Sequence, residues 1–190
     1  MTRHPYQRVG VFIDVQNMYY SAKNLYGCKV DFGKVLKEAV GERQLIRAFA
    51  YVIKADIEPE AAFHTALEKV GFETRVKDLQ VFSGGAKKGD WDVGICVDMV
   101  KMAPRLDVIV LVSGDGDFFD ILNYMHVNQG NLIEVIAFGR TTSTKLIDEA
   151  DTFIDMDKNS DKYLIKDVRR TFTTRTPKAE SAPIPSANPI

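Results

Sequence analysis

Cysteine is scarce in this sequence, with Cys28 and Cys96 the two examples among 190 residues. Two cysteines do not make a disulfide framework, and neither stands in the Cys-x-x-Cys or Cys/His spacing that suits zinc. We expect both to be buried thiols. The three histidines, His4, His64 and His126, form no pattern with other ligand residues and receive no role. The expected compartment is a reducing cytoplasm.

Long apolar runs and an excess of one charge are also missing. No segment approaches the ~20 apolar residues of a membrane span, and residues 1–8 contain no apolar signal segment. We therefore expect no membrane association. Lys and Arg total 25 against 26 Asp and Glu, for a formal net charge of −1. This balance argues against a generally basic coat for nucleic acid, but it excludes neither a local basic patch nor a nucleic-acid substrate.

The length of 190 residues suits one α/β domain with a full core rather than two domains. Residues 158–190 differ in character from the rest, because they begin with scattered Lys and Arg and end in a segment rich in Pro and Ser. Such a segment has too little apolar surface to bury. We expect a domain over residues 1–157 and a largely disordered tail over residues 158–190.

The most informative stretch is residues 107–119. Five consecutive aliphatic residues, Val108 to Val112, predict a strand buried on both faces, as in a parallel sheet. Asp115 and Asp117 follow in a glycine-flanked turn before an amphipathic helix. Open α/β sheets bind their ligands at this end of a strand, so the two carboxylates are candidate ligands.

A second segment near the start of the chain repeats this design. Residues 9–13 form another apolar run, which ends at Asp14 with Asn17 three positions further on. If the two strands are neighbours, the side chains of Asp14, Asp115 and Asp117 converge on one cleft.

The remaining pattern alternates strands and helices. Strands are predicted at residues 45–53, 72–76 and 131–138, with a short edge strand at 152–154, and residues 79–82 are a candidate partner for 72–76. This alternation predicts right-handed βαβ units, and hence an α/β fold with a mostly parallel sheet.

Five aspartates stand at the ends of predicted elements, namely Asp14, Asp92, Asp98, Asp115 and Asp117. Each one alone is well explained as a helix cap. Together they are not, because carboxylates crowded into a cleft raise one another's pKa unless a cation neutralises them. Oxygen ligands without nearby His or Cys favour Mg²⁺ or Mn²⁺ over zinc. A metal that activates water beside a phosphate predicts phosphodiester hydrolysis.

The remaining polar residues of these motifs are Asp92, Asp98, Asn17 and Ser113. Asp92 and Asp98 are six positions apart on one predicted helix, or about 120° around it, so both cannot face one ion. We expect Asp92 to face the cleft, and Asp98 to reach it from the flank or to hold a neighbouring lysine. Asn17 can bind a metal-bound water or a phosphate oxygen, and Ser113 can cap the next helix or bind phosphate.

A set of basic and aromatic residues is expected to contact RNA. Lys87 and Lys88 lie close to Asp92 in sequence and can hold a phosphate backbone near the metal. Trp91 either stacks on unpaired bases or packs in the core. Arg140 and Lys145 follow the strand at 131–138 and extend the basic rim.

Three motifs together resemble those of the NYN domain, in particular its LabA-like branch, within the PIN-like nuclease superfamily. They are residues 12–17 (FIDVQN), 88–93 (KGDWDV) with Asp98 beyond, and 113–118 (SGDGDF). The resemblance implies a three-layer α/β/α fold with a mostly parallel five-stranded sheet in the order 3-2-1-4-5, which makes the first and fourth strands neighbours.

The resemblance also implies a metal-dependent ribonuclease. In that reading Asp14, Asp92, Asp115 and Asp117 surround Mg²⁺ or Mn²⁺, Asn17 and Asp98 support them, and the partner is RNA in single-stranded form.

Two other functions are alternatives to the ribonuclease. A haloacid-dehalogenase-type phosphatase needs an aspartate two residues after its nucleophile, and Gln16 occupies that place, which disfavours it. The other is a catalytically silent regulator that binds RNA or a protein partner through the same fold, and the sequence leaves it open. A homodimer is also left open.

Overall fold

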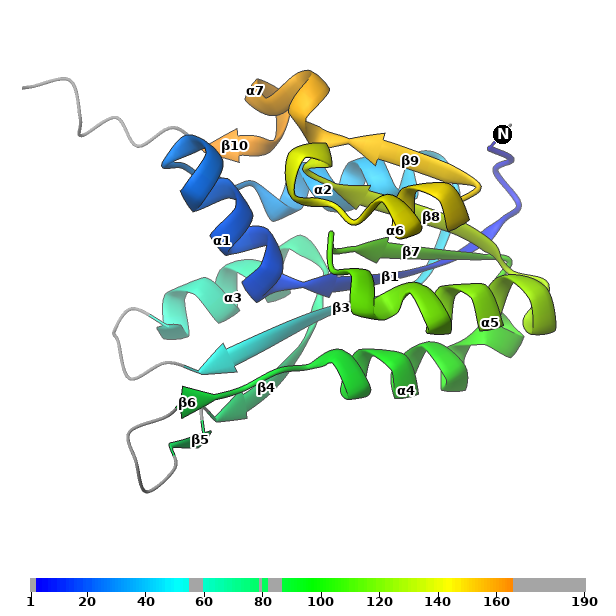
Figure 1. Ribbon diagram of the computed structural model, residues 1–190, viewed down its shortest axis with the longest axis horizontal. Helices are drawn as coiled ribbons and strands as arrows, with labels where there is room; N and C mark the ends of the chain where they lie inside the picture. Colours follow the sequence, from blue (N-terminus) through cyan, green and yellow to red (C-terminus); the bar gives the residue numbers. More distant parts are fainter. Residues whose placement is uncertain (1–2, 55–59, 79, 82–86, 166–190) are drawn as a thin grey trace, which may run out of the picture.

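A parallel sheet of six strands forms the centre of the molecule (Figure 1). The computed structural model describes residues 3–54, 60–78, 80–81 and 87–165. The strands lie in the order β4-β3-β1-β7-β8-β9, and all five pairings are parallel. Their bounds are β1 Arg8–Asp14, β3 Gln44–Lys54, β4 Glu73–Asp78, β7 Val108–Val112, β8 Leu132–Ala137 and β9 Thr152–Asp155. The predicted order 3-2-1-4-5 is confirmed, and the short edge strand adds a sixth member.

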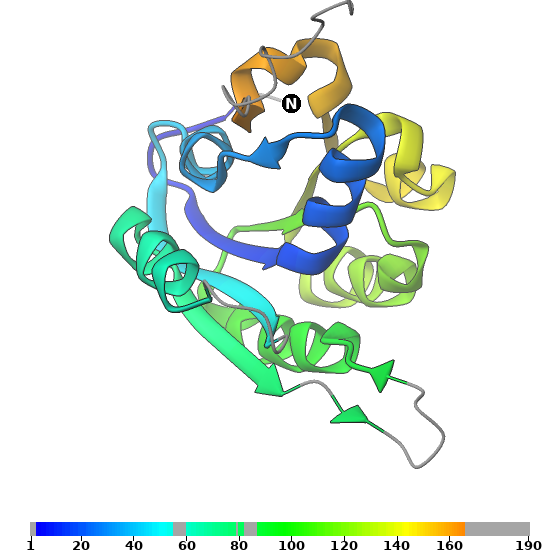
Figure 2. The same cartoon turned by 90° about the vertical axis from the view of Figure 1, so that its left-hand side faces the viewer.

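Helices cover both faces of this sheet, which gives the three layers (Figures 1 and 2). One face carries α1 Val15–Tyr26, α2 Phe32–Val40 and α3 Glu60–Val70. The other carries α4 Asp92–Met102, α5 Phe119–Gln129 and α6 Thr144–Glu149. Single turns of 3-10 helix lie at η1 Ala103–Arg105, η2 Gly116–Phe118 and η3 Gly139–Thr141.

The central strands are apolar throughout because both of their faces are covered. Along β1, Val11 points into the core beneath α1 and α2, whereas Phe12 points into the core beneath α4 and α5. Every residue of β7 from Val108 to Val112 is fully buried. This is the environment that five consecutive aliphatic residues predict.

The helices begin and end where their capping residues stand. The side chain of Asp14 accepts a hydrogen bond from the backbone N–H of Asn17 and caps α1, and Asp31 does the same for α2 through Lys34. Helix α2 ends at Gly41, whose φ of 58° favours glycine.

One predicted pairing is wrong. Strand β4 pairs with β3 over six residue pairs, and β5 Gln80–Val81 pairs instead with β6 Lys87–Lys88 in an antiparallel ladder. Strand β3 offers β4 six backbone partners, whereas the two-residue strand β5 could offer only two. Lys87 and Lys88, expected in a loop, therefore have strand backbone, while residues 82–86 of that loop lie outside the described residues.

The chain continues in regular structure past the predicted boundary at residue 157. After η4 Met156–Asn159 come α7 Ser160–Tyr163 and β10 Leu164–Ile165, which pairs with β2 Lys29–Val30. Tyr163 and Leu164 are 3% and 7% exposed and belong to the core, so residues beyond 157 also pack against the sheet layers. Residues 166–190, most of the predicted tail, lie outside the described residues.

No helix in the described ranges is both long enough and apolar enough to cross a membrane.

Candidate metal and nucleic-acid site

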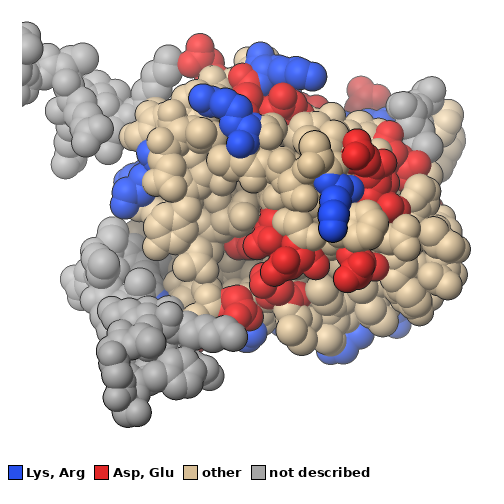
Figure 3. Space-filling view, in the orientation of Figure 1, with Lys and Arg blue, Asp and Glu red and all other residues tan. Residues whose placement is uncertain are grey.

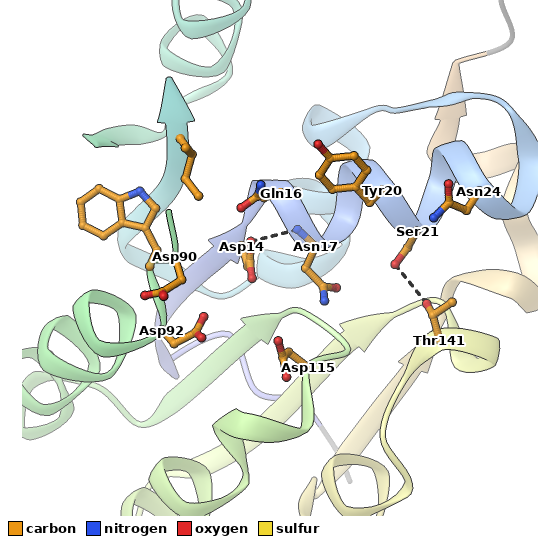
Figure 4. A pocket seen from close by; sticks show the side chains of 12 residues that line it. Asp14, Gln16, Asn17, Tyr20, Ser21, Asn24, Asp90, Asp92, Asp115 and Thr141 are labelled. Carbon is orange, nitrogen blue, oxygen red and sulfur yellow. Dashed lines mark hydrogen bonds between the residues drawn. The ribbon is translucent and has the colours of Figure 1, made fainter. Parts of the chain in front are cut away.

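A pocket of about 380 Å³ opens at the carboxyl ends of β1 and β7 (Figure 4). We call it the carboxylate pocket. Its lining residues are Asp14, Gln16, Asn17, Tyr20, Ser21, Asn24, Ile53, Asp90, Trp91, Asp92, Asp115 and Thr141. In the space-filling view, acidic side chains gather around a hollow on this face of the molecule (Figure 3).

The sheet topology brings Asp14 and Asp115 together. Strands β1 and β7 are parallel neighbours in which Ile13 lies opposite Val112, so both chains leave the sheet at the same edge. Asp14 is the last residue of β1, and Asp115 follows β7 after Ser113 and Gly114. These two acids, separated by a hundred positions in sequence, therefore face one pocket.

The environment of Asp14 disfavours its charge. Burial is the main cause that raises the pKa of the Asp14 carboxyl to about 6. The hydrogen bond from the Asn17 backbone opposes this rise, and the charges of Asp92 and Asp115 contribute to it. Binding of a cation would stabilise the ionised form of Asp14, because the cation offsets both the repulsion from the neighbouring carboxylates and the cost of burying the charge.

Asp92 reaches the same pocket from the first turn of α4. Burial raises its pKa, and the charges of Asp115, Asp90 and Asp117 raise it further, whereas Lys77 lowers it. Asp90 is an acid that the sequence interpretation passed over. It also lines the pocket, and its signal was its place as the first aspartate of the KGDWDV motif, two positions before Asp92.

The turn that carries Asp115 is held by two distant parts of the chain and by a hydrogen bond within the turn itself. The backbone N–H of Gly114 donates to Oδ1 of Asn17 at 3.1 Å, and its carbonyl oxygen accepts from the backbone N–H of Ser143 at 3.0 Å. The Oγ of Ser113, fully buried, accepts from the N–H of Asp115 at 3.2 Å. Ser113 and Asn17 thus position the turn, and Ser113 does not line the pocket.

Asp117 and Asp98 lie away from the pocket lining. Asp117 is exposed and donates its backbone N–H to the side chain of Asp115, although its charge still acts on Asp92. Asp98 lies on the flank, where it accepts a hydrogen bond from the Tyr51 hydroxyl at 3.1 Å and pairs with Arg75 at 3.5 Å. Of the two expectations for Asp98, the contact with neighbouring cations, which include Lys101 at 3.9 Å, is the one observed.

The residues expected to contact RNA have different surroundings. Trp91 lines the pocket, and its indole N–H donates to the backbone oxygen of Val52 at 2.9 Å while the ammonium of Lys77 lies 4.1 Å from its ring centre. It is therefore anchored rather than free to turn. The side chains of Lys87 and Lys88 lie outside the described part of the structure.

Arg140 and Lys145 do not line the pocket. The guanidinium of Arg140 pairs with Asp157 at 3.0 Å and lies 4.8 Å from the ring centre of Tyr26. The ammonium of Lys145 lies 6.0 Å from the ring centre of Phe119. In both cases the cation contacts residues other than Asp14 and Asp115.

The chemistry of the donor set fits a hard divalent cation. Asp14, Asp92 and Asp115 offer carboxylate oxygens, two of them with raised pKa values, and His and Cys are absent from the lining. Within the described residues, no three His, Cys, Asp or Glu side chains lie close enough together to enclose a metal ion. Mg²⁺ is commonly bound by one or two carboxylates and completes its shell with water and phosphate, so an open arrangement suits it.

The pocket contains further polar residues that the sequence did not single out. Gln16, Tyr20 and Asn24 stand on α1 at intervals of four positions and form one side of the lining. In the sequence, their four-residue spacing directly after Asp14 could have indicated that they lie near the site. Polar residues with this spacing are, however, also typical of an ordinary solvent-exposed helix face.

The chain matches one protein family and is similar to two known proteins. The family model described as NYN domain matches residues 8–157. Over 157 residues the chain is 31% identical to the low amplitude and bright protein LabA of Synechococcus elongatus, and the match covers 78% of this chain and 83% of that protein. A crystal structure of a protein of unknown function from Vibrio parahaemolyticus is 34% identical, with a TM-score of 0.78, and covers 87% of this chain and 100% of that one.

Proposed function

The chain belongs to the NYN domain family, and from that premise we propose that it is a metal-dependent ribonuclease that hydrolyses RNA phosphodiester bonds at the carboxylate pocket. One observation carries the proposal. Asp14, Asp92 and Asp115 come from three elements distant in sequence and line one pocket, where the pKa values of Asp14 and Asp92 are raised. Without a cation, this grouping of carboxylates destabilises the fold. A bound metal ion would offset that cost and explain why the acids lie together.

The proposed cofactor is Mg²⁺ or Mn²⁺, bound among Asp14, Asp92 and Asp115 through one or two of these carboxylates, with water and phosphate in the rest of its shell. When bound, such an ion lowers the pKa of a water molecule and shields the charge that develops on a phosphate. Asn17 fixes Asp14 through its backbone and the acidic turn through its side chain, so both carboxylates keep their direction.

The proposed substrate is single-stranded RNA. The lining contains carboxylates but no Lys or Arg among the described residues, so the metal supplies the positive charge that a phosphate needs there. Lys87 and Lys88 follow one another shortly before Asp92 and are the proposed contacts for the flanking backbone. Asp117 and Asp98 are proposed to act through their neighbours rather than on the ion.

Cleavage of RNA by the purified protein tests this proposal. We expect hydrolysis of a single-stranded RNA in Mn²⁺ or Mg²⁺, no hydrolysis in EDTA, and a loss of at least 100-fold, an order-of-magnitude expectation for a lost metal ligand, in Asp14→Asn and in Asp115→Asn. Asp148→Asn is the matched control, since Asp148 is exposed on α6 and does not line the pocket. If the Asp14→Asn, Asp115→Asn double variant cleaves as well as the wild type, the activity belongs to a contaminant and the silent regulator becomes the better account.

A further inference from the structure

Helix α1 carries two polar stripes with different surroundings. The first consists of Asn17 and Ser21, which lie one turn apart and point toward the loops that follow β7 and β8 (Figure 4). Asn17 accepts from the Gly114 N–H, and the hydroxyl of Ser21 accepts from that of Thr141 at 3.1 Å. This stripe fixes α1 against the sheet edge and makes it a rigid platform.

The second stripe, here called the rim stripe, consists of Gln16, Tyr20 and Asn24. Four-residue spacing places them one after another along one side of α1, at intervals of about 6 Å. All three line the carboxylate pocket, with Gln16 next to Asp14 and Asn24 furthest from it along α1 (Figure 4). The side chains of Gln16 and Asn24 make no hydrogen bond to any other residue in the described ranges.

The aromatic member of the rim stripe is available and oriented. Tyr20 is 50% exposed, and its ring meets that of Tyr19 edge to face, with 5.4 Å between the ring centres and 76° between the planes. That contact restricts the direction of the Tyr20 ring. A half-exposed aromatic ring beside a phosphodiester site is the usual platform for an unpaired base.

The charges of the pocket explain why base contacts are needed. Four carboxylates line it, from Asp14, Asp90, Asp92 and Asp115, and the described lining has neither Lys nor Arg. Within this lining, backbone phosphates gain little beyond the bound metal, so contacts that do not depend on cations would add affinity there. Stacking and amide hydrogen bonds are such contacts, and a side-chain amide offers the adjacent acceptor and donor that match N6 and N7 of adenine.

We propose that the rim stripe binds the bases next to the scissile phosphate, with Tyr20 stacked on one base and Gln16 and Asn24 bound to the edges of adenines. The inference rests on the proposed function for its substrate, RNA. It adds a base preference that the acids alone cannot supply, since carboxylates and a metal contact phosphate and not base edges.

Binding measurements with RNAs of about ten nucleotides test it. Fluorescein-labelled oligo(A), oligo(C) and oligo(U) are titrated with full-length protein in Ca²⁺, with the integrity of each RNA checked on a gel. We expect the wild type to favour oligo(A), and Tyr20→Ala to weaken binding of all three by about 5- to 100-fold. Tyr20→Phe retains the ring and restores the affinity. Gln16→Ala and Asn24→Ala should reduce the difference between oligo(A) and the other two RNAs.

A matched control separates these effects from general damage. Tyr124→Ala removes a helical tyrosine that is 43% exposed and lies outside the pocket lining, so it should bind as the wild type does. Melting curves of each variant establish that it folds.

The outcomes distinguish this inference from the proposed function. If the wild type cleaves RNA but Tyr20→Ala binds all three RNAs unchanged, the rim stripe is excluded and the nuclease stands. If Tyr20 and the amides govern RNA binding while no RNA is cleaved in Mn²⁺, the rim stripe stands and the nuclease is excluded. Equal wild-type affinities for the three RNAs would overturn the assignment to adenine.

Discussion

Asp14 is the residue on which the site depends most. It performs a structural task, since its side chain caps α1, and an asparagine could perform that task equally well. Its charge has a different effect. With a pKa raised to about 6 by burial and by Asp92 and Asp115, the ionised carboxylate destabilises the metal-free fold. The cap does not require Asp rather than Asn at this position, and the proposed metal ion supplies a reason for the charge.

The first prediction concerns Asp14→Asn in EDTA. A folded-state pKa near 6 against an ordinary 3.8 means that the native state binds the proton more tightly, so the wild type loses stability as pH rises from about 4 to 6. The variant lacks this loss. Its free energy of unfolding at pH 7 should exceed that of the wild type by at most about 3 kcal/mol, and the difference should vanish below pH ~4. Urea unfolding across this pH range measures it.

Asp107→Asn is the control with the opposite sign. The side-chain hydrogen bond from Arg8 lowers the pKa of the Asp107 carboxyl, so that carboxylate stabilises the fold above its ordinary pKa and the contribution disappears as pH falls through the lowered value. Asp107→Asn should therefore be less stable than the wild type at pH 7 and equal to it at low pH. A stabilising effect in both variants, or in neither, would contradict this account of Asp14.

At the scale of elements, the acidic turn after β7 depends on a close approach between loops. A Cβ added at Gly114 would lie 2.9 Å from the backbone oxygen of Thr141 and 3.1 Å from the Cα of Thr142. Backbone atoms cannot move aside as a flexible side chain can. Glycine at this position thus allows the turn to lie between α1 and the loop after β8, where Asn17 holds it.

The second prediction is that Gly114→Ala displaces the turn without unfolding the protein. Metal affinity should fall by roughly 10- to 100-fold, the range seen when the support of a ligand is lost, because Asp115 moves relative to Asp14. Isothermal titration with Mn²⁺ measures this, and a melting curve establishes that the fold persists. Wild-type metal affinity in Gly114→Ala would mean that the position of the turn does not matter to the ion.

Some of this arrangement could be predicted from the sequence and some could not. The aliphatic runs of β1 and β7 are unambiguous because both of their faces are buried, and the acids after them follow directly. That the two strands are neighbours came from the family resemblance, since periodicity does not give strand order. The partner of Asp98 could not be found, because Arg75 lies on β4, which meets α4 only in the folded chain.

The rim stripe of α1 could not be identified for a related reason. Gln16, Tyr20 and Asn24 have the composition of a solvated face, and only the position of α1 beside the acids gives them another meaning. The local contacts of Lys145 and Arg140 could not be predicted either. Both residues stand after the correct strand, but Asp157 and Phe119 provide local contacts that the sequence did not reveal.

At the scale of the whole molecule, the segment after β9 completes the core on the α1 and α2 side. Tyr163 and Leu164 are buried there, β10 pairs with β2, and Lys162 forms an ion pair with Glu38 of α2. On the same side, Glu134 of β8 pairs with the buried Arg43 at 2.7 Å. These contacts join parts of the chain that are distant in sequence, so the fold is stabilised by its last described residues as well as by its sheet.

The third prediction is that the position of a C-terminal truncation decides stability. A chain that ends at Asp157 loses two buried side chains and should be destabilised by on the order of 3 kcal/mol or more, by analogy with core truncations. A chain that ends at Ile165 keeps both and should match the full-length protein. Urea midpoints of the three proteins measure this. Equal midpoints for all three would show that residues 158–165 contribute little to the fold.

The position of a bound ion is the most direct test of the central claim, which is that Asp14, Asp92 and Asp115 form one divalent-metal site. Crystals soaked in Mn²⁺ should give an anomalous difference peak among these three carboxylates, and crystals of Asp115→Asn should give a weaker peak or none. The account would be contradicted by a wild-type pocket that holds only water at saturating Mn²⁺, or by Mn²⁺ bound elsewhere while these carboxylates stay unliganded.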